Sequence, residues 1–309
     1  MNFKKPKFWD LKEPSLLSYI LLPLTLIFSI NNFFLKLRSK KINKNLKTIC
    51  VGNIYLGGTG KTPLTIKLFE ILKDLKLNIA IGKKHYSNQI DEQIMLKNKA
   101  NLISANSRKK IVQNAIKNKV NIVIFDDGLQ DRSTDYDIKF VCFDSIKWIG
   151  NGLLVPAGPL REKVSSLKKY DAVFLKNCQT DMNIIENDIK KINPKIKIFK
   201  VNYKPTNVNE FNLDKEYLVF SGIGNPESFK NTLIENKFKI IKELTFPDHF
   251  NYSKKIINSI KKEAQTLNAQ IITTEKDYVK IQNENNKDIG FLKIDLEITN
   301  EDDLINLIN

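Results

Sequence analysis

One glycine-rich segment constrains the fold of this chain more than any other feature. The apolar run Thr48–Val51 leads into Gly57-Gly58-Thr59-Gly60-Lys61-Thr62, and a helical pattern begins at Lys61. A strand, a glycine-rich loop and a helix in this order are typical of a phosphate-binding loop, in which backbone N–H groups turn toward phosphate oxygens. Lys61 would neutralise the β- and γ-phosphate oxygens, and the Thr62 hydroxyl would ligate Mg²⁺. We therefore take Gly57, Gly58, Thr59, Gly60, Lys61 and Thr62 as candidate nucleotide-binding residues.

A pair of carboxylates follows a second buried strand. The run Asn121-Ile122-Val123-Ile124-Phe125 ends directly in Asp126, Asp127 and Gly128. In enzymes with a phosphate-binding loop, an acid at this position holds Mg²⁺ or its water molecules, and Mg²⁺ takes only one or two carboxylates together with phosphate oxygens. Asp126 and Asp127 are therefore candidate metal ligands beside Thr62. An acidic turn without a ligand is the alternative.

A third segment, from Gly150 to Glu162, is rich in glycine and proline, which marks a shaped loop. It contains Arg161, one of only four arginines among 50 basic residues. Since the chain uses lysine by default, an arginine at this place favours bidentate recognition of phosphate or carboxylate. Arg161 is therefore a candidate catalytic residue, and a surface pair with Glu162 is the alternative.

The rest of the chain alternates apolar runs with amphipathic stretches, which predicts parallel α/β units with ligands at the carboxyl ends of the strands. The predicted strands are Thr48–Val51, Asn78–Ile81, Ile122–Phe125, Ile138–Phe143, Ala172–Leu175, Ile196–Val201, Tyr217–Phe220, Ile240–Leu244, Gln270–Thr273 and Phe291–Ile294. The predicted helices are Lys61–Leu75, Arg108–Lys119, Met182–Ile192, Pro226–Asn236 and Ser253–Leu267. The polar stretch Asn202–Lys215 is the best candidate for a linker between two domains. Leu102–Ser104 and the end of the chain carry no clear pattern.

The first 47 residues form a segment of their own. Leu16 to Leu35 carry no charge, and the segment holds ten basic side chains against two acidic ones, half of the chain's formal net charge of +16. Twenty apolar residues could just cross a hydrocarbon core, but Pro23, Asn31 and Asn32 interrupt the stretch and lysines flank both ends. We expect an interfacial helix attracted to anionic lipid. A buried structural helix and a membrane span are the alternatives.

Charge and cysteine content exclude other classes of protein. A basic balance is typical of chains that bind polyanions, but the excess charge gathers around the apolar stretch and no RNA-binding signature is present, so nucleic acid is not an expected partner. Cys50, Cys142 and Cys178 lie far apart without a C-x-x-C pattern. They fit reduced, buried thiols, and they form neither a disulfide framework nor a cysteine zinc site.

Two further candidates are weak when judged by residue type alone. The chain has two histidines, and one of them, His249, lies in the turn Phe246-Pro247-Asp248-His249-Phe250. A lone histidine is most often structural. Asp91 and Glu92 after the second strand would by default start a solvated helix.

Taken together, these segments resemble the tetraacyldisaccharide 4'-kinase family, the lipid A 4'-kinases of Gram-negative bacteria. The similarity covers the phosphate-binding loop through Pro63, Asp126-Asp127-Gly128-x-Gln130, Gly150-Asn151-Gly152, Leu160-Arg161-Glu162, Phe246–His249 and Thr274-Glu275-Lys276-Asp277. The family also lacks the first glycine of the strict loop, where this chain has Tyr55. The resemblance implies ATP-dependent phosphorylation of the 4'-hydroxyl of a lipid A disaccharide 1-phosphate, giving lipid IVA, with ATP and Mg²⁺ as cofactors.

The resemblance also implies an architecture and a location. It implies an apolar membrane-associating helix within residues 1–47, a P-loop NTPase-like α/β/α domain over 48–205, and a smaller α/β domain over 206–309 that closes the cleft. The expected location is the cytoplasmic face of the bacterial inner membrane, peripheral or monotopic, with an anionic membrane surface as partner. No obligate protein partner is inferred. The main alternative is another phosphate-loop NTPase, of partitioning or metallochaperone type, that acts as a conformational switch.

Position by position, the resemblance assigns catalytic roles. Asp91 and His249 match an acid and a histidine that are thought to pair in activating the acceptor hydroxyl, with Lys61 and Arg161 as further catalytic residues. We expect the two partners of this pair to come from different domains. The chain departs from the family at three places: Lys83-Lys84-His85-Tyr86 replaces the usual Ser-Arg-Gly-Tyr, Asp131 replaces a histidine, and Ile90 replaces a glycine before the acid.

Overall fold

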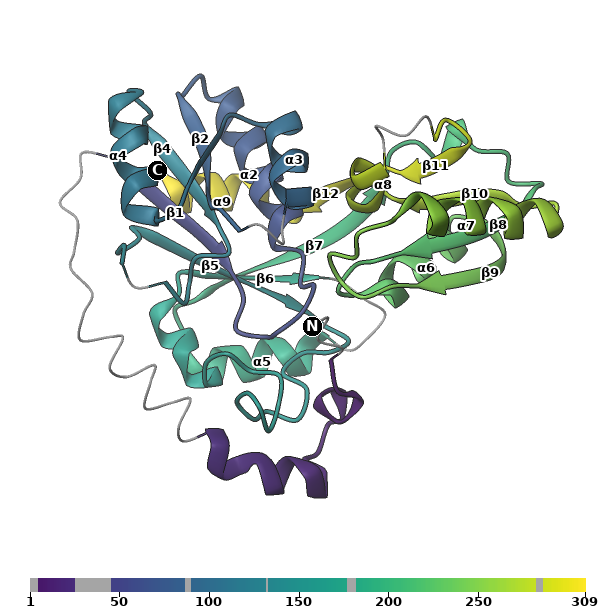
Figure 1. The fold of residues 1–309 in the computed structure, drawn as a ribbon. Coiled ribbons are helices and arrows are strands. Elements are labelled where there is room, and N and C mark those ends of the chain that lie inside the picture. Colours follow the sequence, from purple (N-terminus) through teal and green to yellow (C-terminus); the bar gives the residue numbers. More distant parts are fainter. Residues whose placement is uncertain (1–4, 26–45, 87–89, 132, 177–181, 282–285) are drawn as a thin grey trace. The chain divides into compact units, whose positions relative to one another are not determined.

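The computed structural model of the chain describes residues 5–25, 46–86, 90–131, 133–176, 182–281 and 286–309. The chain forms two compact units. The larger unit comprises Lys5–Tyr86, Lys99–Asn202 and Leu296–Asn309, and the smaller unit comprises residues 87–98 and Tyr203–Asp295. Each unit is built on its own sheet (Figure 1).

The larger unit contains an eight-stranded sheet in the order β12-β7-β6-β5-β1-β4-β2-β3, in which the pairs from β7 to β3 are parallel. Its strands are β1 (Lys47–Gly52), β2 (Ile79–Lys84), β3 (Leu102–Ala105), β4 (Ile122–Asp126), β5 (Ile138–Asp144), β6 (Ala172–Lys176), β7 (Lys197–Pro205) and β12 (Ile294–Ile298). β1 lies between β4 and β5, so the segment that follows β1 leaves the sheet beside two strand ends. Open parallel sheets bind ligands at such a point.

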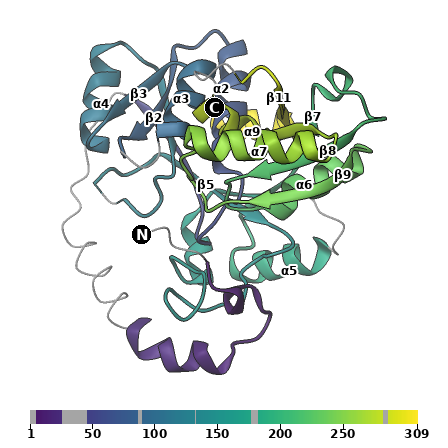
Figure 2. The same cartoon turned by 45° about the vertical axis from the view of Figure 1, so that its right-hand side comes forward.

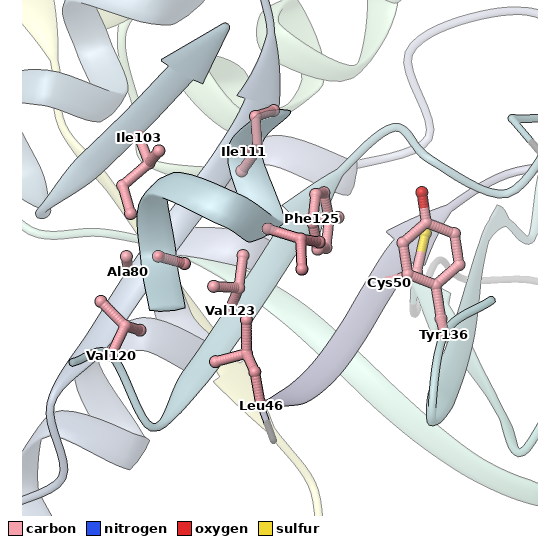
Figure 3. Packing of buried hydrophobic residues seen from close by; sticks show 11 residues of the cluster. Leu46, Cys50, Ala80, Ile103, Ile111, Val120, Val123, Phe125 and Tyr136 are labelled. Carbon is pink, nitrogen blue, oxygen red and sulfur yellow. The ribbon is translucent and has the colours of Figure 1, made fainter. Parts of the chain in front are cut away.

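Helices cover both faces of this sheet. The helices are α2 (Lys61–Asp74), α4 (Arg108–Lys117), α5 (Met182–Ile192) and α9 (Glu301–Ile308), with 3-10 turns at Lys7–Asp10 and Val164–Lys169. Ile111 of α4 packs with Val123 and Phe125 of β4 on one face (Figure 3), and α5 packs on β5 and β6. α2 covers the other face, toward which the alternate residues Ile49 and Ile124 point. The larger unit is therefore the predicted α/β/α sandwich.

The smaller unit contains a four-stranded parallel sheet in the order β11-β10-β8-β9. Its elements are α3 (Ile90–Lys99), a 3-10 turn (Val208–Glu210), β8 (Glu216–Ser221), α6 (Pro226–Glu235), β9 (Lys239–Thr245), α7 (Lys254–Thr266), β10 (Gln270–Thr274), α8 (Glu275–Ile281) and β11 (Ile289–Leu292). Leu218 and Phe220 of β8 pack with α7, whereas Tyr217 and Val219 pack with α6. Because successive strand residues point to opposite faces, α6 and α7 cover opposite faces of this sheet (Figure 2).

The N-terminal segment packs on the larger unit through polar groups. Residues 16–25 are helical, whereas residues 26–35 of the predicted apolar stretch lie outside the described residues. Asn151 Nδ2 donates to the buried Ser18 Oγ at 3.0 Å, and Trp9 Nε1 donates to the Pro156 carbonyl at 3.0 Å. A Cβ at Gly150, where φ is 57°, would lie 2.2 Å from the Trp9 carbonyl oxygen, so this position requires glycine. Gly150 and Asn151 of the third motif therefore anchor the N-terminal segment.

The outer face of this helix exposes apolar side chains. Leu16 and Ile20 are 78% and 64% exposed, and Leu17, Tyr19 and Leu24 are also exposed. This helix turns polar residues toward the protein and apolar residues toward solvent, which is the reverse of the usual pattern of a surface helix. Within the described residues, no helix is both long and apolar enough to span a membrane.

Most predicted elements are confirmed, with one correction. The five predicted helices agree with the structure within two residues at each end. The run Phe291–Ile294, predicted as one strand, is divided between β11 and β12. Lys293 interrupts it because its N–H donates to Asn207 Oδ1 and its carbonyl accepts from the Thr206 N–H. In the described part of the chain, α3, β3, α8, α9 and the three 3-10 turns have no sequence assignment.

The compact units differ from the predicted domain ranges, and the N-terminal segment, predicted as separate, clusters with the larger unit. Residues 90–98 of α3 cluster with the smaller unit, although the chain order sets them within the range 48–205. The last segment, Leu296–Asn309, returns to the larger unit, where the Lys47 side chain donates to the Ile308 carbonyl. The apparent linker begins inside β7, which crosses the boundary at Tyr203.

Candidate active site

The glycine-rich segment forms a loop between β1 and α2. Gly60 precedes α2 with φ of 86°, a left-handed conformation that favours glycine. Gly60 has no side chain to cap the helix, so the N–H groups of Lys61 and Thr62 are left for an anionic ligand, whereas that of Leu64 donates to the Gly60 carbonyl. The fully buried Asn53 donates through Nδ2 to the Gly57 carbonyl at 3.1 Å and to Thr59 Oγ1 at 2.9 Å. One buried amide therefore fixes the shape of the loop.

The acid pair at the end of β4 faces the start of α2. The parallel register pairs Val51 of β1 with Asp126. Thr62 Oγ1 donates to Asp126 Oδ2 at 3.2 Å, and Lys61 Nζ lies 3.9 Å from Asp127 Oδ2. The two carboxylates differ in exposure, since the side chain of Asp126 is 1% exposed and that of Asp127 is 28% exposed. A ligand on the loop can therefore reach Asp127 directly.

A buried lysine neutralises Asp126. The register of β2 on β4 pairs Gly82 with Phe125, so Lys83 and Asp126 follow side by side at the strand ends. Lys83 Nζ lies 2.6 Å from Asp126 Oδ2, and the Lys83 side chain is 2% exposed. A buried charge without a partner is strongly destabilising, so each of these two groups requires the other.

Arg161 pairs with Asp127. Its Nη1 donates to Asp127 Oδ1 at 3.0 Å and to Gln130 Oε1 at 3.1 Å. Gln130 Nε2 in turn donates to the Asn53 carbonyl at 2.9 Å and to Glu162 Oε1 at 3.1 Å. The cations of Lys61 and Arg161 therefore approach the exposed carboxylate from two sides, and the glycine- and proline-rich segment carries Arg161 to this place.

A second arginine, Arg108, supports the segment after β4. It is the first residue of α4, is 3% exposed, and donates to Asp131 Oδ2 and to the Asp127 carbonyl. Burial would raise the pKa of Asp131, but hydrogen bonds from Ser133 and the charge of Arg108 outweigh it and hold this pKa below its usual value. Asp127 has φ of 52°, which is uncommon for a residue other than glycine. The Arg108–Asp131 pair therefore stabilises the backbone that directs Asp127.

Asp91 and His249 meet within the smaller unit. His249 Nδ1 lies 3.0 Å from both carboxylate oxygens of Asp91, whose side chain is 4% exposed, while that of His249 is 19% exposed. An ionised carboxylate only accepts hydrogen bonds, so Nδ1 carries a proton. Nε2 lies 3.6 Å from Glu92 Oε1 and 3.8 Å from Asp248 Oδ1. Both residues belong to the same compact unit, so the expectation that they come from different domains is not met, because α3 packs with residues 203–295.

Two lysines of α8 hold Asp91 in its charged form. Lys280 Nζ lies 3.4 Å and Lys276 Nζ 3.9 Å from Asp91 Oδ2, and Lys276 Nζ lies 3.5 Å from His249 Nε2. Burial would raise the pKa of Asp91, but the hydrogen bond from His249 and the charges of Lys276 and Lys280 lower it overall. Burial would lower the pKa of Lys276, and Glu92, Asp248 and Asp91 raise it above its usual value. Asp91 is therefore an ionised acid that orients the ring of His249.

The motif Thr274–Asp277 supports this cluster from the core. Asp277 is fully buried and accepts from Thr274 Oγ1 at 2.8 Å, from Tyr252 Oη at 3.1 Å and from the Gly222 N–H at 2.9 Å. Lys280 Nζ lies 2.9 Å from Asp277 Oδ1. Asp277 thus fixes Lys280, which contacts Asp91.

The predicted site residues fall into two groups. One group lies where β1 and β4 end in the larger unit and comprises Gly57 to Thr62, Asp126, Asp127 and Arg161. The other group, Asp91 and His249, lies in the smaller unit. Sequence reasoning assigned no site role to Lys83, Arg108, Lys276 or Lys280. Two of them could have been noticed where the chain departs from the family pattern. Lys83 is itself such a departure, and Arg108 pairs with another, Asp131.

The chain is similar throughout its length to known proteins. A sequence profile of the family described as "Tetraacyldisaccharide-1-P 4'-kinase" matches residues 17–309. Tetraacyldisaccharide 4'-kinases from Pelagibacter ubique and Rickettsia typhi are 47% and 34% identical to the chain. The first alignment covers 99% of this chain and 97% of the relative, and the second covers 96% and 95%. A crystal structure of LpxK from Aquifex aeolicus in complex with ATP has the same fold, with a TM-score of 0.68 at 21% identity over 95% of this chain and 98% of the other.

We expect Arg108→Met to lower the free energy of unfolding by about 2–4 kcal/mol at pH 7, because Asp131 loses its buried cation. A carboxylate with a depressed pKa contributes stability above its unfolded pKa and loses it as the pH falls through the folded pKa. The difference between variant and parent should therefore shrink below about pH 4. Urea unfolding at several pH values measures this, with Asp131→Asn as the matched variant. A difference that does not change with pH contradicts the pairing.

Proposed function

The chain belongs to the tetraacyldisaccharide 4'-kinase family, and we propose from this membership which of its residues carry the reaction. The protein is a phosphotransferase with an alcohol acceptor. It transfers a phosphoryl group from ATP to the 4'-hydroxyl of a tetraacyldisaccharide 1-phosphate, a lipid A precursor, and the product is lipid IVA. This reaction class replaces the alternative of a phosphate-loop switch protein.

The observation that carries the assignment of residues is the loop between β1 and α2. The N–H groups of residues 57–62 would hold the phosphates of ATP, with the Lys61 ammonium beside the β- and γ-phosphate oxygens. Arg161 would neutralise charge that develops on the transferred group, because it contacts Oδ1 of Asp127 while Lys61 lies near Oδ2 of the same carboxylate. Phosphoryl transfer depends mainly on such positioning and charge stabilisation.

The donor set next to the loop fits Mg²⁺. The hydroxyl of Thr62 and the carboxylates of Asp126 and Asp127 supply only oxygen, the ligand type that Mg²⁺ prefers. Among the described residues, no three His, Cys, Asp or Glu side chains gather as they would for a protein-held metal. This agrees with an ion that takes most of its ligands from phosphate and water. Bound there, Mg²⁺ would neutralise charge on the β- and γ-phosphates.

His249 would act as the base toward the acceptor hydroxyl. Its Nε2 can accept a proton because Nδ1 donates to Asp91. As the 4'-oxygen attacks, the hydroxyl proton would pass to Nε2, and the Asp91 carboxylate would stabilise the imidazolium that forms. The nearby Lys276 and Lys280 keep Asp91 charged, so it orients the ring without taking the proton itself.

The helix over residues 16–25 would bind the membrane surface. Leu16, Ile20 and Leu24 repeat every four residues and share one exposed face, and the exposed Lys7 and Lys12 lie nearby in the chain. Apolar bulk together with basic charge is the combination that holds a helix in an anionic lipid interface. We therefore propose the cytoplasmic face of the inner membrane as the location, with peripheral or monotopic attachment.

Loss of the loop lysine tests the assignment of the phosphate site. We expect Lys61→Ala to reduce kcat/KM for transfer from γ-³²P-ATP to the lipid A precursor by about 10²–10³-fold or more, because charge stabilisation dominates this chemistry. EDTA should abolish transfer and excess Mg²⁺ should restore it. Lys67→Ala, one and a half turns further along α2, is the control. Transfer that persists in Lys61→Ala or in EDTA contradicts the proposal.

The proposed base predicts a non-additive pair of variants. Asp91→Ala and His249→Ala should each reduce kcat by about 10²–10⁴-fold, as loss of general base catalysis does. The dissociation constant of ATP should change little. The double variant should be no more than a few-fold worse than the worse single variant, since the two groups act as a unit. Multiplicative losses in single-turnover assays would show that the residues act independently.

Charged substitutions on the exposed helix face test the membrane surface without deleting the anchored segment. Leu16→Glu with Ile20→Glu should lower binding to vesicles of anionic phospholipid by about tenfold or more, because burial of both side chains is lost. Ile184→Glu on α5 is the matched control, since Ile184 is 63% exposed and Ile20 is 64% exposed. Vesicle sedimentation at two salt concentrations measures the effect. Equal loss in both variants would argue against this helix as the binding face.

A further inference from the structure

Lys83 is a buried cation whose presence phosphoryl transfer does not explain. Its ammonium lies 2.6 Å from Asp126 Oδ2, the same oxygen that accepts the hydrogen bond from Thr62 Oγ1 at 3.2 Å. The other oxygen, Oδ1, lies 3.4 Å from Thr65 Oγ1, whose hydroxyl also donates to the Lys61 carbonyl at 3.0 Å. Oδ2 of Asp126 is therefore the oxygen that groups of the protein engage most closely.

The neighbouring Asp127 is in a different situation. Its side chain is 28% exposed. The side chains of its partners Arg161 and Lys61 are long, and they are 24% and 14% exposed. These groups can rearrange when a ligand arrives. Lys83 and Asp126, at 2% and 1% exposure, are enclosed by the sheet and α2.

A divalent cation bound directly to Asp126 Oδ2 would be repelled by Lys83. With a metal–oxygen distance of about 2.1 Å, the ion would lie no more than about 5 Å from the ammonium. At this separation like charges repel strongly in a buried environment, where water screens them little. Phosphate oxygens that arrive with the ion would offset this repulsion, because they bring negative charge to the same place.

We propose that Lys83 is a positioning residue that keeps Asp126 as a hydrogen-bond acceptor and makes divalent-cation binding depend on ATP. Asp126 then orients the Thr62 hydroxyl and accepts hydrogen bonds from water on the ion, while the ion's direct ligands come from Thr62, phosphate and water. The proposal rests on the proposed phosphate site. It also assigns a role to a residue at which this chain departs from the family pattern.

Binding of Mn²⁺ to the full-length protein, followed by electron paramagnetic resonance of free Mn²⁺, tests the proposal without an activity assay. The parent protein should bind Mn²⁺ at least tenfold more tightly with ATP than without it. Lys83→Met should bind Mn²⁺ without nucleotide at least tenfold more tightly than the parent does. Lys84→Met is the matched control and should behave as the parent. Equal nucleotide-free affinities in Lys83→Met and the parent overturn the proposal.

Two further measurements keep the result interpretable if Lys83→Met is unstable. Mn²⁺ should raise the unfolding temperature of Lys83→Met in the absence of nucleotide but leave that of the parent unchanged, because a ligand stabilises the state that binds it. Lys83→Met with Asp126→Asn removes both charges and should fold, bind ATP and show no nucleotide-free Mn²⁺ site. Nucleotide-free binding in this double variant also overturns the proposal. Failure of the parent to bind ATP would instead contradict the phosphate site itself.

Discussion

The parallel pairing of β1 with β4 is the constraint on which the larger unit and its site depend. Their register sets Val51 beside Asp126, where the chain leaves β1 for the glycine-rich loop. A slip of one residue would turn Asp126 to the opposite face of the sheet and present Phe125 in its place. Packing fixes the register, because Phe125 must meet Ile111 of α4 on one face while Ile124 points to the other. The apolar core therefore determines which carboxylate meets Thr62.

The architecture could be read from the sequence because buried parallel strands are continuous apolar runs and their helices have one apolar face. α3 lacks that signal. Its first turn carries Asp91 and Glu92, which form ion pairs and hydrogen bonds with Lys276, Lys280 and His249. Such contacts join residues more than 150 positions apart and leave no periodicity in the chain. The assignment of α3 to the smaller unit therefore needed the structure.

In the site too, some residues could be predicted from the sequence and others could not. Lys61, Thr62 and the acid pair follow a local pattern, and Arg161 stood out because arginine is rare here. Lys83 and Arg108 are as decisive for the geometry, yet in a chain with 50 basic residues neither the pattern around them nor their type shows that they are buried beside a carboxylate. Each is placed by a strand or helix terminus next to a carboxylate that is distant in sequence. Pairing of charges between separate elements depends on the tertiary structure, so these two pairs could not be predicted from composition or local pattern.

Because Asp91 and His249 belong to one compact unit, the contacts that would control the proposed base lie within that unit. If the partners came from different domains, ring orientation would depend on domain movement. Here α3 and α8 supply the acid and two lysines, and the turn after β9 supplies the histidine, all within one compact unit. The same contacts that lower the pKa of Asp91 fix which imidazole nitrogen carries the proton. The tautomer needed to accept a proton at Nε2 is therefore set by the fold of the smaller unit, before any substrate contact contributes.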